Sequence, residues 1–412
     1  MKRRTRSAIF ALAAFSLVAA ACGDDESSEP EATQPAPEDT DAPDVTDAPD
    51  VTDAPDVTDT TEHSMQECSE LTPVTLQLQW VTQAQFAGYY AAIDQGLYEA
   101  MCLDVTILEG AVDIVPQEVL ASGGADFAIS WVPKALASRE AGANIVNIAQ
   151  VFQRSGTLQV SFVDTGVTSP ADFAGKTVGN WGFGNEYEVF AAITAAGLDP
   201  AADVTLVQQN FDMVALLEGE IAAAEAMTYN EYAQVLEATN PETGELYTPE
   251  DFNVISYEDE GVGMLQDAIW ADGERLGDAE YRDTAVRFVA ASLAGWAFCR
   301  DDAQACADIV LGQSPILGAS HQLWQMNEVN KLIWPAADGV GYIDQAAWDR
   351  TVEISLGTKN LEGATVLTAE PDADAFTNDI VMEALAMLEE MGIDVNGDGF
   401  APLDVTLNPG GE

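Results

Sequence analysis

Residues 75–108 have the sequence TLQLQWVTQAQFAGYYAAIDQGLYEAMCLDVTIL. Thr75–Trp80 has the pattern of a strand, Ala84–Met101 has apolar residues at helical spacing, and Asp104–Leu108 again resembles a strand. A strand, a helix and a second strand in this order are the repeating unit of parallel sheets covered by helices. The stretch therefore predicts an α/β fold.

The same alternation continues along the body of the chain, and Pro133 suits the first turn of another helix. Further strands are expected at Asp126–Ser130, Ile145–Phe152, Lys176–Asn180, Val204–Gln208, Ala222–Met227 and Asn253–Ser256, and further helices at Pro116–Ser122, Glu186–Ala196, Met213–Glu218 and Asn230–Ala238. Two such series predict two doubly wound lobes with a cleft between them. We assign residues 67–163 to the first lobe and residues 164–264 to the second.

After Met264 the pattern becomes mainly helical, and residues 265–412 are expected to pack back on the first lobe. The helices expected there are Tyr281–Cys299, Ala303–Leu311, Glu328–Leu332 and a last one near Asp379–Met391.

The first 22 residues combine a basic start, an apolar run from Ala8 to Ala21 and then Cys22, which indicates a signal peptide. Small residues before Cys22 fit the lipobox of bacterial lipoproteins, in which that cysteine is acylated, although Ala19 stands where leucine is usual. A plain cleavage site beside an incidental cysteine is the alternative. The prediction is a lipid anchor on the extracytoplasmic face of the cell membrane.

Residues 23–66 contain fifteen Asp or Glu, no Lys or Arg, and three copies of Asp-Ala-Pro-Asp-Val-Thr. Such a segment buries too little apolar surface to offset its ordering entropy, so an extended acidic tether is expected. The formal net charge of the chain is −55. That charge argues against nucleic acid or an anionic membrane surface as a partner.

Four cysteines follow the tether: Cys68, Cys102, Cys299 and Cys306. An even number in an exported chain favours disulfides, and three connectivities are possible. We favour the local pairs Cys68–Cys102 and Cys299–Cys306, with zinc ligation as the alternative.

Ligands of parallel sheets bind beyond the carboxyl ends of the strands, and there this sequence places aromatic and amide side chains. That combination suits a flat heterocycle stacked between rings and held by hydrogen bonds. The candidate ligand-binding residues are Trp80, Gln83, Gln85, Phe86, Tyr90, Trp131, Phe152, Trp181, Phe183, Asn185, Glu186, Tyr187, Met227, Tyr229 and Asn230. Phe86 and Tyr90 also have helical spacing, for which a place in the core is the alternative.

Catalytic signatures are sparse. The two histidines, His63 and His321, belong to no acid–base or metal constellation, and the sequence has neither a phosphate-binding loop nor a nucleophile elbow. Residues 394–399 match the first half of an EF-hand loop, but Val405 stands where the bidentate glutamate belongs, so a turn is the favoured interpretation. We expect no enzyme activity, no cofactor and no metal.

Several segments together resemble solute-binding proteins of the aliphatic-sulfonate, nitrate and thiamine-pyrimidine precursor group. They are Leu76–Trp80, Phe86–Tyr90, Gln95–Tyr98, Leu103–Ile107, Ala121–Phe127 and Gly219–Met227. The resemblance implies a type II periplasmic-binding fold that closes on its ligand at a two-strand hinge, near Ser161–Asp164 and Gly263–Ala268. It also implies a monomer that delivers a small molecule to the permease and ATPase of an ABC importer.

The resemblance further implies that Trp80, Trp131 and Trp181 wall the ring, that Asn185, Glu186 and Tyr187 bind its edge, and that Tyr229 or Asn230 closes the far side. A thiamine-pathway pyrimidine is the first choice of ligand, riboflavin the second, and a sulfonate or nitrate the third.

The same superfamily contains the fungal thiamine-pyrimidine synthase, which uses a lysine, a histidine and a cysteine-rich run. Here Ser130, Lys134 and residues 261–265 stand at those places, so the synthase is disfavoured.

Overall fold

The computed structural model describes residues 68–412. The predicted signal peptide, the predicted lipidation site Cys22 and the predicted acidic tether lie outside the described residues. Within residues 68–412, no helix is both long and apolar enough to cross a membrane.

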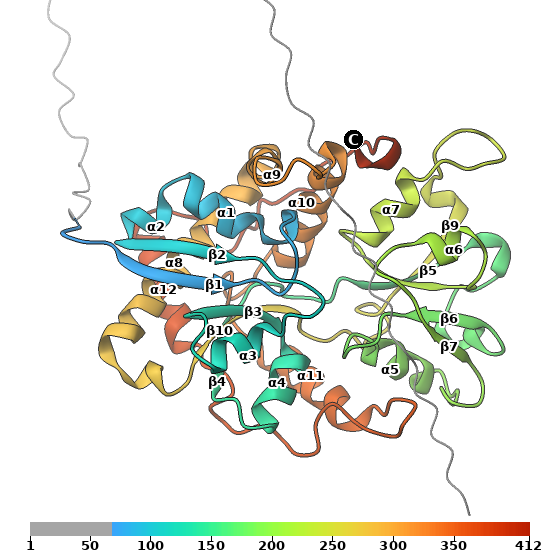
Figure 1. Ribbon diagram of the computed structural model, residues 1–412, viewed down its shortest axis with the longest axis horizontal. Coiled ribbons are helices and arrows are strands. Elements are labelled where there is room, and N and C mark those ends of the chain that lie inside the picture. Colours follow the sequence, from blue (N-terminus) through green and yellow to red (C-terminus); the bar gives the residue numbers. More distant parts are fainter. Residues whose placement is uncertain (1–67) are drawn as a thin grey trace, which may run out of the picture. The chain divides into compact units, whose positions relative to one another are not determined.

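The first sheet has five strands in the order β2-β1-β3-β10-β4 (Figure 1). β1 (Thr72–Gln77) pairs in parallel with β2 (Leu103–Leu108) and with β3 (Phe127–Trp131). β10 (Asp267–Asp272) runs antiparallel between β3 and β4 (Ile145–Gln150). This sheet and its helices form what we call the first lobe.

The second lobe is built around two smaller sheets. β5 (Thr157–Phe162) lies between β8 (Ala224–Met227) and β9 (Phe252–Ser256), and all pairings are antiparallel. β6 (Thr177–Asn180) pairs in parallel with β7 (Thr205–Gln208).

A single bridge between Val178 and Ala223 joins these two sheets, so the strands follow one another as β7-β6-β8-β5-β9. This order repeats that of the first lobe, β2-β1-β3-β10-β4. In each lobe the antiparallel member, β5 or β10, is the strand that arrives from the other lobe. The strands of each lobe therefore pair in a mixed, parallel and antiparallel arrangement. The sequence pattern predicts wholly parallel sheets, and that prediction is wrong.

The helices cover the sheets and continue into the C-terminal part. They are α1 (Ala87–Asp94), α2 (Leu97–Ala100), α3 (Pro116–Ala121), α4 (Val132–Glu140), α5 (Tyr187–Ala195), α6 (Val214–Leu217), α7 (Glu231–Glu237), α8 (Ala279–Asp301), α9 (Ala303–Leu311), α10 (Ala319–Ile333), α11 (Gln345–Gly357) and α12 (Asp379–Glu390). The helix predicted over Ala84–Met101 is interrupted, because Gly96 takes the left-handed φ of +66° that glycine tolerates between α1 and α2.

The predicted lobe boundaries need correction. β5 belongs to the second lobe, so the first crossing lies before Thr157, not at residue 163 and not at the predicted hinge Ser161–Asp164. The return crossing ends where β10 begins at Asp267, which lies within the predicted hinge Gly263–Ala268. β5 and β10 are short and buried, and the sequence pattern did not distinguish either strand from the neighbouring loops.

Gln266 joins the two crossing segments to each other. Its side-chain oxygen accepts from the Gly156 amide at 2.9 Å, and its amide nitrogen donates to the Thr157 hydroxyl at 2.7 Å and the Ser155 hydroxyl at 3.1 Å. Gln266 is almost wholly buried, so these bonds are shielded from water. The two crossings therefore meet at one hydrogen-bonded point.

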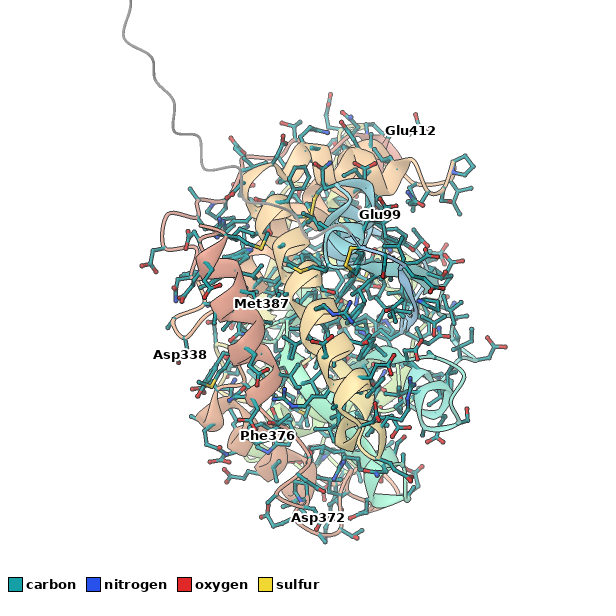
Figure 2. All side chains as sticks on the ribbon, turned by 90° about the vertical axis from the view of Figure 1, so that its left-hand side faces the viewer. Glu99, Asp338, Asp372, Phe376, Met387 and Glu412 are labelled. Carbon is teal, nitrogen blue, oxygen red and sulfur yellow. A yellow bond between two sulfur atoms is a disulfide. The ribbon has the colours of Figure 1, made fainter. Side chains whose placement is uncertain are left out.

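The long helix α8 covers the first lobe, where it packs beside α1 and α12 (Figure 2). Its N-cap Asp278 accepts hydrogen bonds from the amides of Glu280 and Tyr281. The approach to α1 is close, because a Cβ on Gly295 would overlap the Gly88 carbonyl oxygen. Trp296 is fully buried beside this contact.

The C-terminal helices do not pack on the first lobe alone, as the sequence had suggested. α10 also contacts α7, and α11 also contacts α5, and both α7 and α5 belong to the second lobe. The helix α11 was missed by the sequence analysis.

Both favoured disulfides are present, Cys68–Cys102 and Cys299–Cys306. The first ties the segment before β1 to the turn before β2, and the second joins the last turn of α8 to the first turn of α9. The prediction of two local pairs is confirmed.

Candidate functional site

A cavity of about 600 Å³ lies between the two lobes, at the carboxyl ends of β1, β3, β6 and β8. Its walls come from residues 79–141 of the first lobe, residues 181–231 of the second and two residues after α11, Thr365 and Val366. This volume is in the usual range for small-molecule sites. The location agrees with the rule that ligands bind beyond the strand ends.

Aromatic rings from both lobes face the cavity and meet across it. Trp80 of the first lobe lies 4.9 Å from Phe211 of the second, measured between ring centroids. Phe211 stacks in turn against Trp181 at 6.0 Å and an interplanar angle of 19°. Trp131 and Tyr229 add further aromatic surface. Such walls favour a flat, unsaturated ligand.

Asp267, the first residue of β10, orients three of the side chains in the first lobe. Its Oδ1 accepts from Trp131 Nε1 at 2.8 Å and from Gln79 Nε2, and its Oδ2 accepts from Gln85 Nε2 at 2.9 Å. Trp131, Gln79 and Gln85 all line the cavity, whereas Asp267 lies behind them. Burial raises the pKa of Asp267 to about 7, and its three hydrogen bonds oppose that rise.

The second lobe contributes a glycine turn between β6 and α5. Gly182, Phe183 and Gly184 all have left-handed φ values, +69°, +56° and +85°. This unusual backbone holds Phe183 at the rim of the cavity, with 69% of its surface exposed. Below the turn, a carboxylate oxygen of the buried Glu225 accepts from the Trp181 amide at 2.7 Å, and burial raises the pKa of Glu225 well above its usual value.

One polar chain connects α10 with the cavity wall. His321 Nδ1 is 2.7 Å from Glu237 Oε1, and its Nε2 is 3.0 Å from Asn230 Oδ1. The amide nitrogen of Asn230 donates to Glu231 at 2.8 Å, which leaves the Asn230 oxygen as the acceptor facing His321. Both ring nitrogens thus lie within hydrogen-bond distance of an oxygen. His321, which carried no role in the sequence analysis, therefore joins the first lobe to a cavity residue.

Eleven of the fifteen candidate residues line the cavity. They are Trp80, Gln83, Gln85, Trp131, Trp181, Phe183, Asn185, Tyr187, Met227, Tyr229 and Asn230. Their common feature is a position at the end of a strand or in the segment that follows it.

The other four do not line it. Phe86 is fully buried in the core, Tyr90 is buried with its hydroxyl 2.8 Å from Thr82 Oγ1, and Phe152 packs edge-on against Tyr229 behind the cavity wall. Glu186 turns back to accept from the Gly184 amide at 2.9 Å. For Phe86 and Tyr90 the core alternative suggested by helical spacing is correct.

Several residues that line the cavity are not among the candidates predicted from the sequence, including Gln79, Gln117, Lys134 and Phe211. Phe211 stands three residues after β7, so the strand-end rule applied to that strand would have found it. Lys134 was considered only for an enzymatic role. It occupies the first turn of α4, and its position on the cavity wall depends on how that helix follows β3.

The loop at residues 394–399 is held by the protein itself. Asp394 Oδ1 accepts from the amides of Asn396 and Gly397, and Arg300 donates to the Asp394 carbonyl at 2.7 Å. The guanidinium of Arg300 also lies 3.4 Å from Asp394 Oδ2. These contacts are those of an Asx-type turn neutralised by an arginine.

The mixed strand order and the cavity between the lobes define a protein with the periplasmic-binding fold. The periplasmic sulfonate-binding protein SsuA of Methylobacillus flagellatus has this fold, with a TM-score of 0.54, 16% identity, and coverage of 82% of this chain and 99% of that one. The type II fold predicted from the sequence is confirmed. A mutant form of the enzyme DSZB has it too, with a TM-score of 0.51, 14% identity, and coverage of 76% of this chain and 99% of that one, so the fold alone does not separate binding from catalysis.

The chain belongs to the NMT1/THI5-like family, whose model matches residues 83–305. The riboflavin-binding protein RibY of Chloroflexus aurantiacus is 27% identical over an alignment of 329 residues that covers 76% of this chain and 86% of RibY. The formylaminopyrimidine-binding protein of Halalkalibacterium halodurans is 30% identical over 192 residues, 46% of this chain and 57% of that protein. The resemblance inferred from the sequence is thereby confirmed at the level of the family.

Proposed function

We propose that the protein is the solute-binding component of an ABC importer and that it captures an aromatic nitrogen heterocycle without transforming it. The observation that carries the proposal is the set of aromatic walls from both lobes around one cavity. The relatives named for riboflavin and for formylaminopyrimidine support it, since both names describe binding of such rings.

Within this class we place a flavin first and a thiamine-pathway pyrimidine second, which reverses the order suggested by the sequence. A cavity of about 600 Å³ exceeds the needs of a single pyrimidine ring. The relative that covers the larger share of this chain is a riboflavin binder, and this supports the same order. The similarity to the formylaminopyrimidine-binding protein supports the pyrimidine as the second candidate.

Ligand-dependent stabilisation tests the proposal. A ligand that binds only the folded state, present at 100 times its Kd, raises the free energy of unfolding by about 2.7 kcal/mol, which corresponds to a rise in Tm of about 3–4 °C for a chain of this size. We expect that rise with riboflavin or with 4-amino-5-hydroxymethyl-2-methylpyrimidine, but not with taurine or nitrate. If neither ring changes Tm at millimolar concentration, the proposed ligand class is wrong. An imine absorbance with pyridoxal phosphate, lost on replacing Lys134, would favour an enzyme instead.

The proposal includes anchoring through an acylated Cys22. A Cys22→Ser variant produced in a bacterium with lipoprotein processing is expected to leave the membrane fraction, because no cysteine remains at the processing site to accept the lipid. Ala19→Leu, which restores the usual lipobox residue, is the matched control and should stay in the membrane fraction. Equal amounts of wild type and Cys22→Ser in that fraction on an immunoblot would contradict lipid anchoring.

A further inference from the structure

Lys134 brings a positive charge into a cavity whose other surfaces are mostly uncharged. Lys134 and Glu231 are the two charged residues among those lining it. The ammonium of Lys134 lies 5.0 Å from the centroid of the Trp131 ring, and its aliphatic chain faces Gly184 of the second lobe. The side chain thus crosses the cavity wall from one lobe towards the other.

Within residues 68–412, the other buried or half-buried cations have an acceptor in the protein. For example, Arg154 donates to the carbonyls of Lys331 and Trp334, Lys176 donates to the Thr165 carbonyl, and Arg350 pairs with Glu258. Lys134 has neither a hydrogen bond nor an ion pair there, and the same holds for the exposed Lys359. Lys134 is therefore a cavity cation with three donor hydrogens and no protein oxygen to receive them.

Carboxylates lie farther from Lys134 and affect its charge. Burial lowers the pKa of Lys134 to about 8, while Glu186, Glu225 and Asp267 oppose that shift. These carboxylates would repel a fully anionic ligand. The acceptor that Lys134 lacks is therefore better supplied by a neutral oxygen than by a phosphate or a sulfonate.

We propose, on the basis of the proposed function, that Lys134 binds a ring carbonyl of the ligand and makes the cavity selective for oxo-substituted over amino-substituted heterocycles. A dioxo ring edge offers oxygen acceptors, to which the ammonium can donate. An aminopyrimidine edge places an N–H donor beside each ring-nitrogen acceptor. Its ring becomes cationic when such a nitrogen is protonated, so this edge faces Lys134 less favourably than a dioxo edge does. The amides of Gln79 and Gln85 can serve either edge and do not discriminate.

Replacing Lys134 tests this selectivity. A hydrogen bond to a charged group contributes about 1.5–3 kcal/mol, so we expect Lys134→Met to raise the Kd for riboflavin roughly 10- to 100-fold. Lys134→Arg, which keeps the charge and the donors, should stay within a few-fold of wild type. Lys359→Met, the same change on an exposed lysine, should have no effect. Binding is measured by quenching of flavin fluorescence.

The aminopyrimidine 4-amino-5-hydroxymethyl-2-methylpyrimidine is the second probe, with binding measured by titration calorimetry. Its Kd should be unchanged or lower in Lys134→Met. An equal loss for both ligands, unchanged riboflavin binding by Lys134→Met, or binding of the aminopyrimidine alone by wild type would each overturn the role of Lys134. Failure of wild type to bind either ring would instead overturn the proposed function.

The pH profile supplies a readout that a purely structural lysine would not change. The Kd of wild type for riboflavin should rise as the pH increases through about 8, because the ammonium loses its charge. Lys134→Arg should show no such rise, because guanidinium stays protonated. Glu186, Glu225, Glu231 and Asp267 are present in both proteins, so the difference between the profiles isolates Lys134. Superimposable profiles would contradict the proposal.

Discussion

Replacing Asp267 by leucine is expected to lower the affinity for riboflavin about 100-fold or more. The change removes the acceptor of three donors, on the buried Gln85 and Trp131 and the half-buried Gln79, which all line the cavity. Each buried donor left unpaired costs about 1–3 kcal/mol, and about 3 kcal/mol expressed in binding corresponds to about 100-fold. Asp267 itself does not line the cavity, so the loss would arise from misplaced neighbours.

Two further variants separate positioning from general unfolding. Asp267→Asn keeps the shape and one acceptor oxygen, and it should lose less affinity than Asp267→Leu while remaining folded by circular dichroism. Asp272→Asn, at the other end of β10, removes a carboxylate that accepts from Glu274 and Arg275 outside the cavity and should bind as wild type does. Wild-type affinity in a folded Asp267→Leu would show that the carboxylate does not organise the site.

Asp267 also gives the folded state a defined dependence on pH. Its pKa is raised to about 7 in the folded protein, above the value near 4 of an unfolded chain. Its contribution to stability is therefore complete below about pH 4 and is lost as the pH rises through 7. Urea unfolding at pH 5 and pH 8 should show a smaller difference for Asp267→Asn than for wild type.

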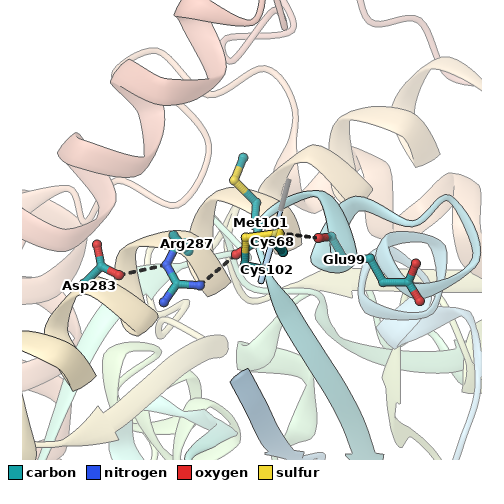
Figure 3. The surroundings of a disulfide bond; sticks show 6 residues. All are labelled: Cys68, Glu99, Met101, Cys102, Asp283 and Arg287. Carbon is teal, nitrogen blue, oxygen red and sulfur yellow. Dashed lines mark hydrogen bonds and ion pairs between the residues drawn. A yellow bond between two sulfur atoms is a disulfide. The ribbon is translucent and has the colours of Figure 1, made fainter. Parts of the chain in front are cut away.

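Reducing the Cys68–Cys102 disulfide is expected to lower the free energy of unfolding by about 3–4 kcal/mol. This disulfide closes the longer of the two loops and therefore restricts the unfolded chain more. The sequence separation is 34 for this pair and 7 for Cys299–Cys306, for which about 2 kcal/mol is expected. Figure 3 shows the contacts beside Cys102. Arg287 of α8 donates to the carbonyl of the preceding residue, Met101, at 2.7 Å and to Asp283 at 2.8 Å. The disulfide thus joins the segment before β1 to a turn that Arg287 binds to α8.

The two bridges are measured separately by leaving one at a time. A Cys299→Ala and Cys306→Ala double variant retains the first bridge, and a Cys68→Ala and Cys102→Ala double variant retains the second. Urea unfolding of each, with and without reductant, gives the contribution of the remaining bridge without changing the packing of its sulfur atoms. A larger effect of reductant on the variant that retains Cys299–Cys306 would contradict the loop-length argument.

Part of the fold could be predicted because it depends on local pattern. The strand, helix and strand over residues 75–108 lie within a few residues of their predicted positions, and the two disulfides join cysteines close to each other in sequence. β5 and β10 were not recognised, because their neighbours in the sheets come from the other half of the chain. Pairing between such distant segments leaves little trace in a short window of sequence.

The candidate site divides in the same way. The sequence by itself shows that aromatic and amide side chains follow the strands. The rule that ligands bind at strand ends selected fifteen candidates, of which eleven line one cavity. Only the tertiary structure sent Phe86, Tyr90 and Phe152 into the core, because which side of a helix or strand end is buried depends on what packs against it. It also brought Lys134 and Phe211 to one cavity and placed Asp267 behind the cavity wall, although Lys134 and Asp267 lie 133 positions apart in the chain. The local sequence determined which side chains stand at the strand ends. The two segments that cross between the lobes decided which of these side chains come together in the cavity.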